Sequence, residues 1–304
     1  MEREVRGYSH GFVTTPTSKR RTSARLAPYV LGLPAIIWLA VFFVIPLVLM
    51  LVKALQECNP ATGVCTMTWN VASLSDAWSN SSAIIFRSLG YALAATVIDL
   101  VLSFPIAYWI AFYGGRRKNF FLMMLLVPFF VSFVIRTVIW KFLLSSDGLV
   151  IHTLQNLHLV SSDYQILGTT FAVVAGLAYN FLPFTALPLY VSLERLNPAL
   201  LEASHDLYAG RITTFRKVVL PLCIPGIFAA FLLTFIPAFG DYVNQQVLGG
   251  FTNTMVGTVI QNLFLVSNDF PGGSALSAIV MGISLIGIVV YGRLLGSKSI
   301  GDFV

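Results

Sequence analysis

Six polar side chains lie inside or beside long apolar stretches of this 304-residue sequence. A charge in the middle of a membrane helix costs about 2.5–3.5 kcal/mol on insertion scales, so each such group needs a partner or a watery cavity. Residues of this kind are candidates for ligand binding or for structural pairing. They are Asp99, Arg136, Lys141, Asn180, Asp241 and Asn244.

Asp241 has the setting most suited to binding a cation. Gly240 precedes it where an apolar run ends, and Gly249-Gly250 follows, so the sequence predicts a broken helix that lines a watery cavity. A carboxylate there can receive an ammonium group, and aromatic faces add cation–π contacts. The alternative is a helix cap with interfacial aromatic residues. The pathway candidates are Asp241, Tyr242, Asn244, Phe239, Trp140 and Tyr179.

The other charges in apolar runs have simpler interpretations. We expect Asp99 and Arg136 to form a structural ion pair between two membrane helices, in preference to a role in binding a ligand. Lys141 lies near the predicted external end of a helix, from which its long side chain can reach the interface.

Enzymatic chemistry has no support in the residue pattern. The nearest phosphate-loop pattern, residues 292–299, has the wrong spacing. No His-Glu-x-x-His pattern or nucleophile elbow occurs, and the four histidines are scattered. We therefore expect no catalytic residue, no metal site and no cofactor in this chain. Basic residues are not interleaved with aromatic ones, so nucleic acid is not an expected partner.

The elements that carry these residues are predicted to be membrane helices. The sequence is 57% hydrophobic and 11% charged, whereas an ordinary soluble domain has about 25% charged residues. Six apolar runs exceed the roughly 20 residues that a helix needs to cross a bilayer. The fold class is therefore all-α, an integral membrane protein with about six transmembrane helices. The runs are 27–52, 88–113, 120–144, 166–193, 219–239 and 274–295.

The basic residues give this arrangement an orientation. Of the 19 Lys and Arg residues, 15 lie in the segments 3–25, 116–118, 195–217 and 293–298. Positively charged loops stay in the cytoplasm, so both termini are expected there. The first apolar run is far longer than the 7–15 residues of a signal peptide, so it is expected to remain as a helix. We predict a cytoplasmic tail at 1–26, one membrane domain at 27–296 and a second tail at 297–304.

Two cysteines, Cys58 and Cys65, fall in the first predicted external loop. An oxidising compartment would allow a disulfide between them, and two free thiols are the equally weighted alternative. Cys223 lies in an apolar run, where it is expected to pack.

The third cytoplasmic segment, 195–221, reads as two short helices joined by a turn just before a membrane helix. Such a pair is suited to docking into a groove of a soluble partner. From Glu202 to Pro221 the spacing resembles the EAA loop of ABC importer permeases: Glu-Ala-Ala, three residues, Gly, nine residues, Ile, any residue, Leu-Pro. Identical matches are Glu202, Ala203, Leu220 and Pro221, and Val218 is a conservative one. The resemblance implies that this loop, with Asp206 inside it, contacts an ATPase.

Two residues depart from the EAA pattern. Ser204 stands in place of the second alanine, and Tyr208 stands in place of the glycine. Because that glycine occupies a turn where positive φ is readily reached and Tyr resists it, we expect Gly210 to take over the role two residues later.

Two further stretches, 127–140 and 235–250, resemble spermidine/putrescine permeases. The resemblance implies a type I ABC importer permease of the MetI-like fold in the inner membrane of a prokaryote, with polyamines as its cargo. It also implies a second, different permease subunit rather than a homodimer, a dimer of ATP-binding subunits that hold ATP and Mg, and an extracytoplasmic substrate-binding protein.

Two alternatives stay open at this point. One is an importer of the same class for another small solute, such as an oxyanion, thiamine or iron. The other is an ion-coupled secondary transporter, which would be expected to show inverted repeats with paired broken helices. No such repeat is found in the sequence.

Overall fold

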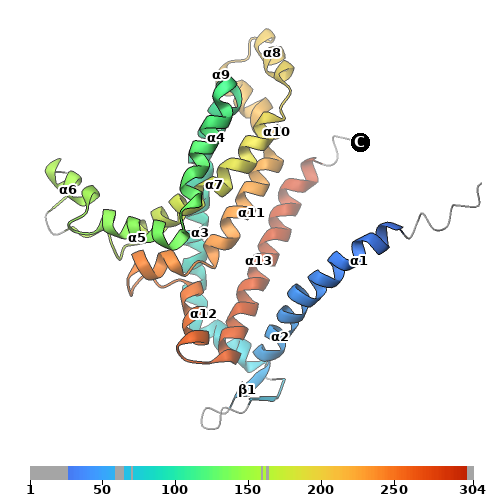
Figure 1. Ribbon diagram of the computed structural model, residues 1–304, viewed down its shortest axis with the longest axis vertical. Helices are drawn as coiled ribbons and strands as arrows, with labels where there is room; N and C mark the ends of the chain where they lie inside the picture. Colours follow the sequence, from blue (N-terminus) through green and yellow to red (C-terminus); the bar gives the residue numbers. More distant parts are fainter. Residues whose placement is uncertain (1–26, 59–64, 70, 159, 162–163, 300–304) are drawn as a thin grey trace, which may run out of the picture. The chain divides into compact units, whose positions relative to one another are not determined.

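The computed structural model describes residues 27–58, 65–69, 71–158, 160–161 and 164–299. The chain divides into two compact units, Met1–Met50 and Leu51–Val304. Most of the described residues belong to helices (Figure 1).

The first unit is a single helical path. It consists of α1 (Ala27–Leu39), the π-helical turn η2 (Ala40–Val44) and the start of α2 (Ile45–Ala54). Pro46 has no N–H group and its ring crowds the preceding turn, and a wider π turn relieves that crowding. From residue 32 to residue 50, where the side chains are described, most of them are exposed, which suits contact with lipid.

The second unit is built around α3 (Ala72–Tyr113), α7 (Thr170–Glu194) and α11 (Ile224–Phe239), with α13 (Phe270–Ser299) packed beside them. Small residues such as Ala92, Ala95 and Ala178 lie buried in this core, and they allow the helices to approach closely without polar groups meeting lipid. Two side-chain contacts set the register of α3 against α7. Tyr91 Oη lies 2.8 Å from Thr170 Oγ1, and Ser103 Oγ donates to the Leu182 carbonyl at 3.4 Å.

The run 120–144, predicted as one membrane helix, is sharply bent in the structure. After the 3-10 turn η3 (Gly115–Arg117), the chain forms α4 (Lys118–Leu126), the 3-10 turn η4 (Val127–Phe130), α5 (Phe133–Leu144) and α6 (Leu149–Asn156). The two halves meet at 87°. Val131 and Ser132 have extended ψ angles of 138° and 137°, so the helical hydrogen bonding stops there, directly after the turn that contains Pro128.

A second bend precedes α11. The chain passes through α8 (Pro198–Asp206), α9 (Arg211–Thr214), the π turn η5 (Phe215–Val219) and α10 (Leu220–Leu222), and the Arg211–Leu222 and Ile224–Phe239 helices meet at 67°. Pro221 follows this π turn at the same spacing as Pro46 follows η2. The residues 198–222 are called the elbow below.

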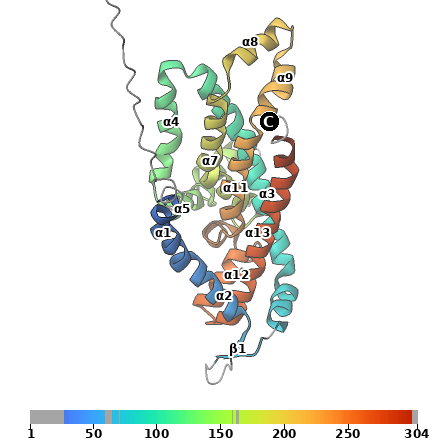
Figure 2. The same ribbon diagram turned by 90° about the vertical axis from the view of Figure 1, so that its right-hand side faces the viewer.

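Beyond α11 lie the π turn η6 (Gln245–Gly249) and α12 (Val256–Leu265). A two-stranded antiparallel hairpin, β1 (Gln56–Cys58) and β2 (Cys65–Met67), precedes α3 and pairs the backbone of Cys58 with that of Cys65. The cysteine side chains lie outside the described part, so their bonding stays a prediction. Within the second unit, the elbow and the hairpin lie at opposite ends (Figures 1 and 2).

Four helical stretches of the described residues are long and apolar enough to cross a bilayer: Gly32–Ala54, Ala72–Tyr113, Thr170–Glu194 and Phe270–Arg293. The two bent pairs raise the number to six if each pair is one span. The all-α membrane fold predicted from the sequence is therefore confirmed, with two of its six spans bent.

The orientation predicts which exposed residues can be labelled from outside the cell. His152 on α6 and His205 on α8 are both exposed. In a variant whose three native cysteines are replaced by serine, we expect His152→Cys to react with a membrane-impermeant maleimide in intact cells. His205→Cys should react only after permeabilisation, and the reverse pattern would overturn the orientation.

Candidate functional site

A buried network of hydrogen bonds lies where the chain leaves α11. Asn244 donates from its backbone N–H to Asp241 Oδ1 at 2.8 Å, and from Nδ2 to Asp241 Oδ2 at 3.3 Å. Asn180 Nδ2 donates to Asn244 Oδ1 at 2.9 Å and to Thr137 Oγ1 at 3.0 Å. All four residues are buried. The network thus joins α5, α7 and the segment after α11.

This network supports the broken helix predicted around Gly240. The Asp241 carboxylate caps the start of the next helical turn through the Asn244 N–H, which is the capping alternative stated above. A β-carbon at Gly257 would clash with the carbonyl oxygen of Gly240, so glycine is needed for α12 to pack against the break. The break is therefore built by close backbone approach and by side-chain caps, as membrane-buried irregular backbone requires.

Arg136 is buried beside this network with few polar partners. Its Nη1 lies 3.5 Å from the Asn180 carbonyl, and its Nε has no partner among the described residues. The guanidinium carbon lies 5.7 Å from the ring centroids of both Phe129 and Phe133. Two aromatic faces therefore lie within cation–π range of the guanidinium.

The predicted ion pair between Asp99 and Arg136 is wrong. Arg136 contacts α7 and two phenylalanine rings instead, and the one ion pair among the described residues joins Lys118 and Glu194 at 2.5 Å. Asp99 is fully buried in α3, and neither carboxylate oxygen has a hydrogen-bond partner there. Nothing in the described structure explains this isolated acid.

The aromatic candidates separate into two groups. Trp140 and Tyr179 form an edge-to-face pair with ring centroids 5.3 Å apart, and Tyr242 is 43% exposed. All three rings are at least partly exposed near the break. Phe239 is fully buried and stacks on Phe235 with centroids 5.9 Å apart, so it packs the core and does not line an exposed path as predicted.

The turn of the elbow differs from the prediction. Tyr208 itself adopts φ +53°, whereas Gly210 has φ −66° and ψ 159°. Tyr208 N–H donates to the His205 carbonyl at 2.9 Å and Ala209 N–H to the Ser204 carbonyl at 3.0 Å, the hydrogen-bond pattern of a Schellman motif. The tyrosine therefore occupies the left-handed position that the EAA pattern gives to glycine, and Gly210 begins α9 with an extended backbone.

Ser204, the other departure, ties the two halves of the elbow together. Its hydroxyl lies 3.0 Å from Thr214 Oγ1 and donates to the Leu201 carbonyl at 2.7 Å. Both Ser204 and Thr214 are buried. An alanine could not make this bond, so the serine gives α8 and α9 a polar link.

The tip of the elbow is an exposed, partly apolar surface. Tyr208 is 98% exposed and Leu207 is 82% exposed, and Ile212 is exposed beside them. Exposed apolar side chains that gather among polar ones are typical of an interaction site. The sequence-predicted residues Glu202, Ala203, Asp206 and Gly210 share this exposed part, and Leu220 and Pro221 lie at its base.

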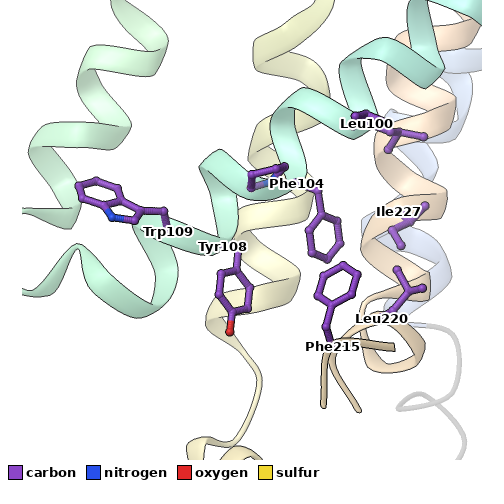
Figure 3. A pocket seen from close by; sticks show the side chains of 9 residues that line it. Leu100, Phe104, Tyr108, Trp109, Phe215, Leu220 and Ile227 are labelled. Carbon is purple, nitrogen blue, oxygen red and sulfur yellow. The ribbon is translucent and has the colours of Figure 1, made fainter. Parts of the chain in front are cut away.

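The base of the elbow contacts α3 through aromatic side chains. Phe215 packs edge-to-face on Phe104 with ring centroids 5.2 Å apart (Figure 3). The two rings lie in an apolar cavity of about 630 Å³ that Tyr108, Leu220 and Ile227 also line. A displacement of the elbow would therefore be transmitted to α3 through these two rings.

Sequence reasoning missed Thr137, Thr214 and the Phe104–Phe215 contact. Threonine in an apolar run gives no signal, because its hydroxyl can be satisfied by its own helix, as Thr137 is by the Phe133 carbonyl at 3.0 Å. Aromatic contacts between segments 111 residues apart depend on tertiary packing, which periodicity does not reveal.

Residues 78–296 match the family described as "Binding-protein-dependent transport system inner membrane component". The spermidine/putrescine transport system permease protein PotB of Escherichia coli is 38% identical over 218 residues, which cover 71% of this chain and 79% of the relative. PotB of Haemophilus influenzae is 36% identical, with 69% and 73% covered. A bacterial ABC transporter that imports the acidic polysaccharide alginate has the same fold, with a TM-score of 0.64, 17% identity, and coverage of 90% and 96%.

The strained turn yields a stability prediction. Because a non-glycine residue in the left-handed region costs about 1 kcal/mol, Tyr208→Gly should raise the midpoint of thermal unfolding in detergent by about 2 °C. Tyr208→Ala is the matched control, since it removes the exposed ring but keeps the β-carbon. An equal gain from both variants would show that the backbone is not the cause.

Proposed function

The chain belongs to the family of binding-protein-dependent transport system inner membrane components, and from this premise we propose that it is a permease subunit of an ATP-driven polyamine importer. In this proposal it forms half of a translocation pore and hydrolyses no ATP itself. The observation that carries the proposal is the elbow, a pair of short helices whose exposed tip is held in shape by internal hydrogen bonds.

We infer that an ATP-binding subunit grips the tip of the elbow. Leu207, Tyr208 and Ile212 offer apolar anchors, and the exposed Glu202 offers a charge that sets the register of docking. A dimer of such subunits that closes around ATP would pull on two elbows at once. Phe215 would then transmit the pull to Phe104 on α3, and the helices would tilt as rigid bodies between inward-open and outward-open states.

Polyamine is the proposed cargo because the relatives at 36–38% identity are named as spermidine/putrescine permeases. The side chains at the break are suited to a cargo that is a flexible chain of ammonium groups. Asp241 supplies a carboxylate, Asn244 supplies amide groups, and the rings of Tyr242, Trp140 and Tyr179 supply faces for methylenes and cations. Asp241 is buried and capped in the described state, so it would meet substrate only when the pore opens.

Three partners complete the proposed assembly. A second, different permease subunit forms the other half of the pore, and the ATP-binding subunits lie on the cytoplasmic side with both termini of this chain. An extracytoplasmic substrate-binding protein delivers the cargo. The alginate transporter of the same fold was solved in complex with a periplasmic protein bound to an alginate pentasaccharide, which supports such a partner.

Charge reversal at the elbow tests the proposed coupling. Glu202→Lys should reduce the amount of ATP-binding subunit that copurifies with the membrane complex at least about tenfold, because a mispaired charge at a docking surface is costly. ATP-dependent uptake should fall in parallel while insertion is unchanged. The control is Asp147→Lys, the same reversal at an exposed acid outside the elbow. Normal copurification of Glu202→Lys would remove the docking assignment.

Loss of the carboxylate at the break tests the proposed cargo. Asp241→Asn keeps an oxygen that can accept from the Asn244 N–H, so the fold should be retained. The charge is lost, and a charge-assisted hydrogen bond of about 1.5–3 kcal/mol corresponds to roughly a tenfold or larger fall in spermidine uptake at limiting concentration. Uptake that falls only in proportion to protein abundance would contradict the substrate role.

A further inference from the structure

Side chains from distant helices hold the backbone of residues 250–254 in place. Arg87 on α3 donates from Nη1 to the Thr252 carbonyl at 2.8 Å, and from Nε and Nη2 to the Thr254 carbonyl at 3.0 and 2.6 Å. Asn253 Oδ1 accepts from Tyr91 Oη at 2.8 Å, and Asn253 Nδ2 donates to the Gly168 carbonyl. The 250–254 loop is therefore clamped against α3 and the start of α7.

Two further side chains, one just before the loop and one inside it, also bond to its backbone. Gln245 Nε2 donates to the Gly250 carbonyl at 2.8 Å, and Thr254 Oγ1 donates to the Phe251 carbonyl at 3.1 Å. Gly250 has φ +59° and ψ −163°, a conformation that is open essentially to glycine alone. Four carbonyl groups of this five-residue loop thus accept hydrogen bonds from side chains. These bonds fix the path of the loop backbone.

Phe251 is the residue that this clamped loop presents. Its side chain is fully exposed, at 102% of the reference area, although most phenylalanines are well buried. The fold gains nothing from such a ring. An aromatic side chain on a rigid loop is well suited to anchoring a protein partner, because little conformational freedom is lost on binding.

Polar and apolar side chains both surround Phe251. Together with Phe251, a cavity of about 510 Å³ is lined by Lys141 on α5, by Gln246 and by Asn262 on α12, and these three are at least partly exposed. Amide and ammonium groups in contact with hydrocarbon would be costly, so this surface faces water or a polar partner. Lys141 supplies the basic side chain of this cavity, which would complement an acidic group on the partner.

The position of the loop identifies the side of the membrane. The 250–254 loop contacts Tyr91 on α3 and Thr170 at the start of α7. The elbow follows the other end of α7, which is at Glu194. If the elbow faces the cytoplasm, as the proposed function requires, the 250–254 loop faces outward.

We propose that the 250–254 loop is a docking site for the extracytoplasmic substrate-binding protein, with Phe251 as its anchor and Lys141 as the partner of an acidic side chain. This inference rests on the proposed function. A second permease subunit is a less suitable occupant, because helix contacts within a bilayer use small residues and neutral polar side chains, whereas this surface also carries the charged Lys141.

The test uses the complete transporter in lipid nanodiscs and its spermidine-loaded binding protein. We expect Phe251→Ala to raise the binding-protein concentration for half-maximal ATPase stimulation at least about tenfold, the range of an interface anchor. The basal ATPase rate should not change. Leu265→Ala is the matched control, because Leu265 is an exposed apolar side chain at the end of α12 that does not line this cavity. Lys141→Glu should weaken stimulation, whereas Lys141→Arg should preserve it.

The outcomes separate this inference from the proposed function. If the unaltered transporter responds to the binding protein and Phe251→Ala responds equally well, only the docking site is wrong. If the unaltered transporter shows no ATP hydrolysis, the proposed function itself fails. A photo-crosslinker at position 251 should capture the binding protein, and capture of the second permease or of lipid instead would overturn the docking assignment.

Discussion

The second unit depends on the satisfaction of polar groups where its helical path is interrupted inside the membrane. Hydrocarbon offers no hydrogen bonds, so an interrupted helix persists only where other parts of the protein replace the missing ones. Asp241 and Asn244 cap the break after α11, and Asn180 and Thr137 extend these bonds to α7 and α5. The same network brings a carboxylate and several aromatic rings to one place, so the feature that permits the break also supplies the chemistry proposed for the cargo.

Rigid irregular segments occur at both ends of the second unit. At one end, Tyr208 holds a left-handed turn and Ser204 bonds to Thr214, so the elbow has a defined shape. At the other end, Arg87 holds the loop that presents Phe251. A device that transmits force needs such stiff contact points, because a flexible segment would absorb the displacement instead of passing it to the helices.

Hydropathy was sufficient to locate the membrane helices and the broken helix, because apolar length and glycine placement act locally. The finer predictions failed where tertiary contacts decide. Tyr208 tolerates positive φ since the Schellman hydrogen bonds offset the strain. Asp99 lacks Arg136 as a partner since the guanidinium lies against the rings of Phe129 and Phe133 instead. Phe239 packs inward because its ring stacks on Phe235 in the core. Residue type and spacing cannot report which of several partners a buried group meets.

In the proposed function, this chain moves polyamines only when an ATP-binding subunit acts on its elbow. The most direct measurement is radiolabelled spermidine uptake into proteoliposomes that contain this chain, the second permease and the ATP-binding subunit, with the loaded binding protein on the receiving side. The account predicts uptake that requires ATP hydrolysis and persists when ion gradients are dissipated. Uptake by the permeases alone, driven by an ion gradient without ATP, would contradict it.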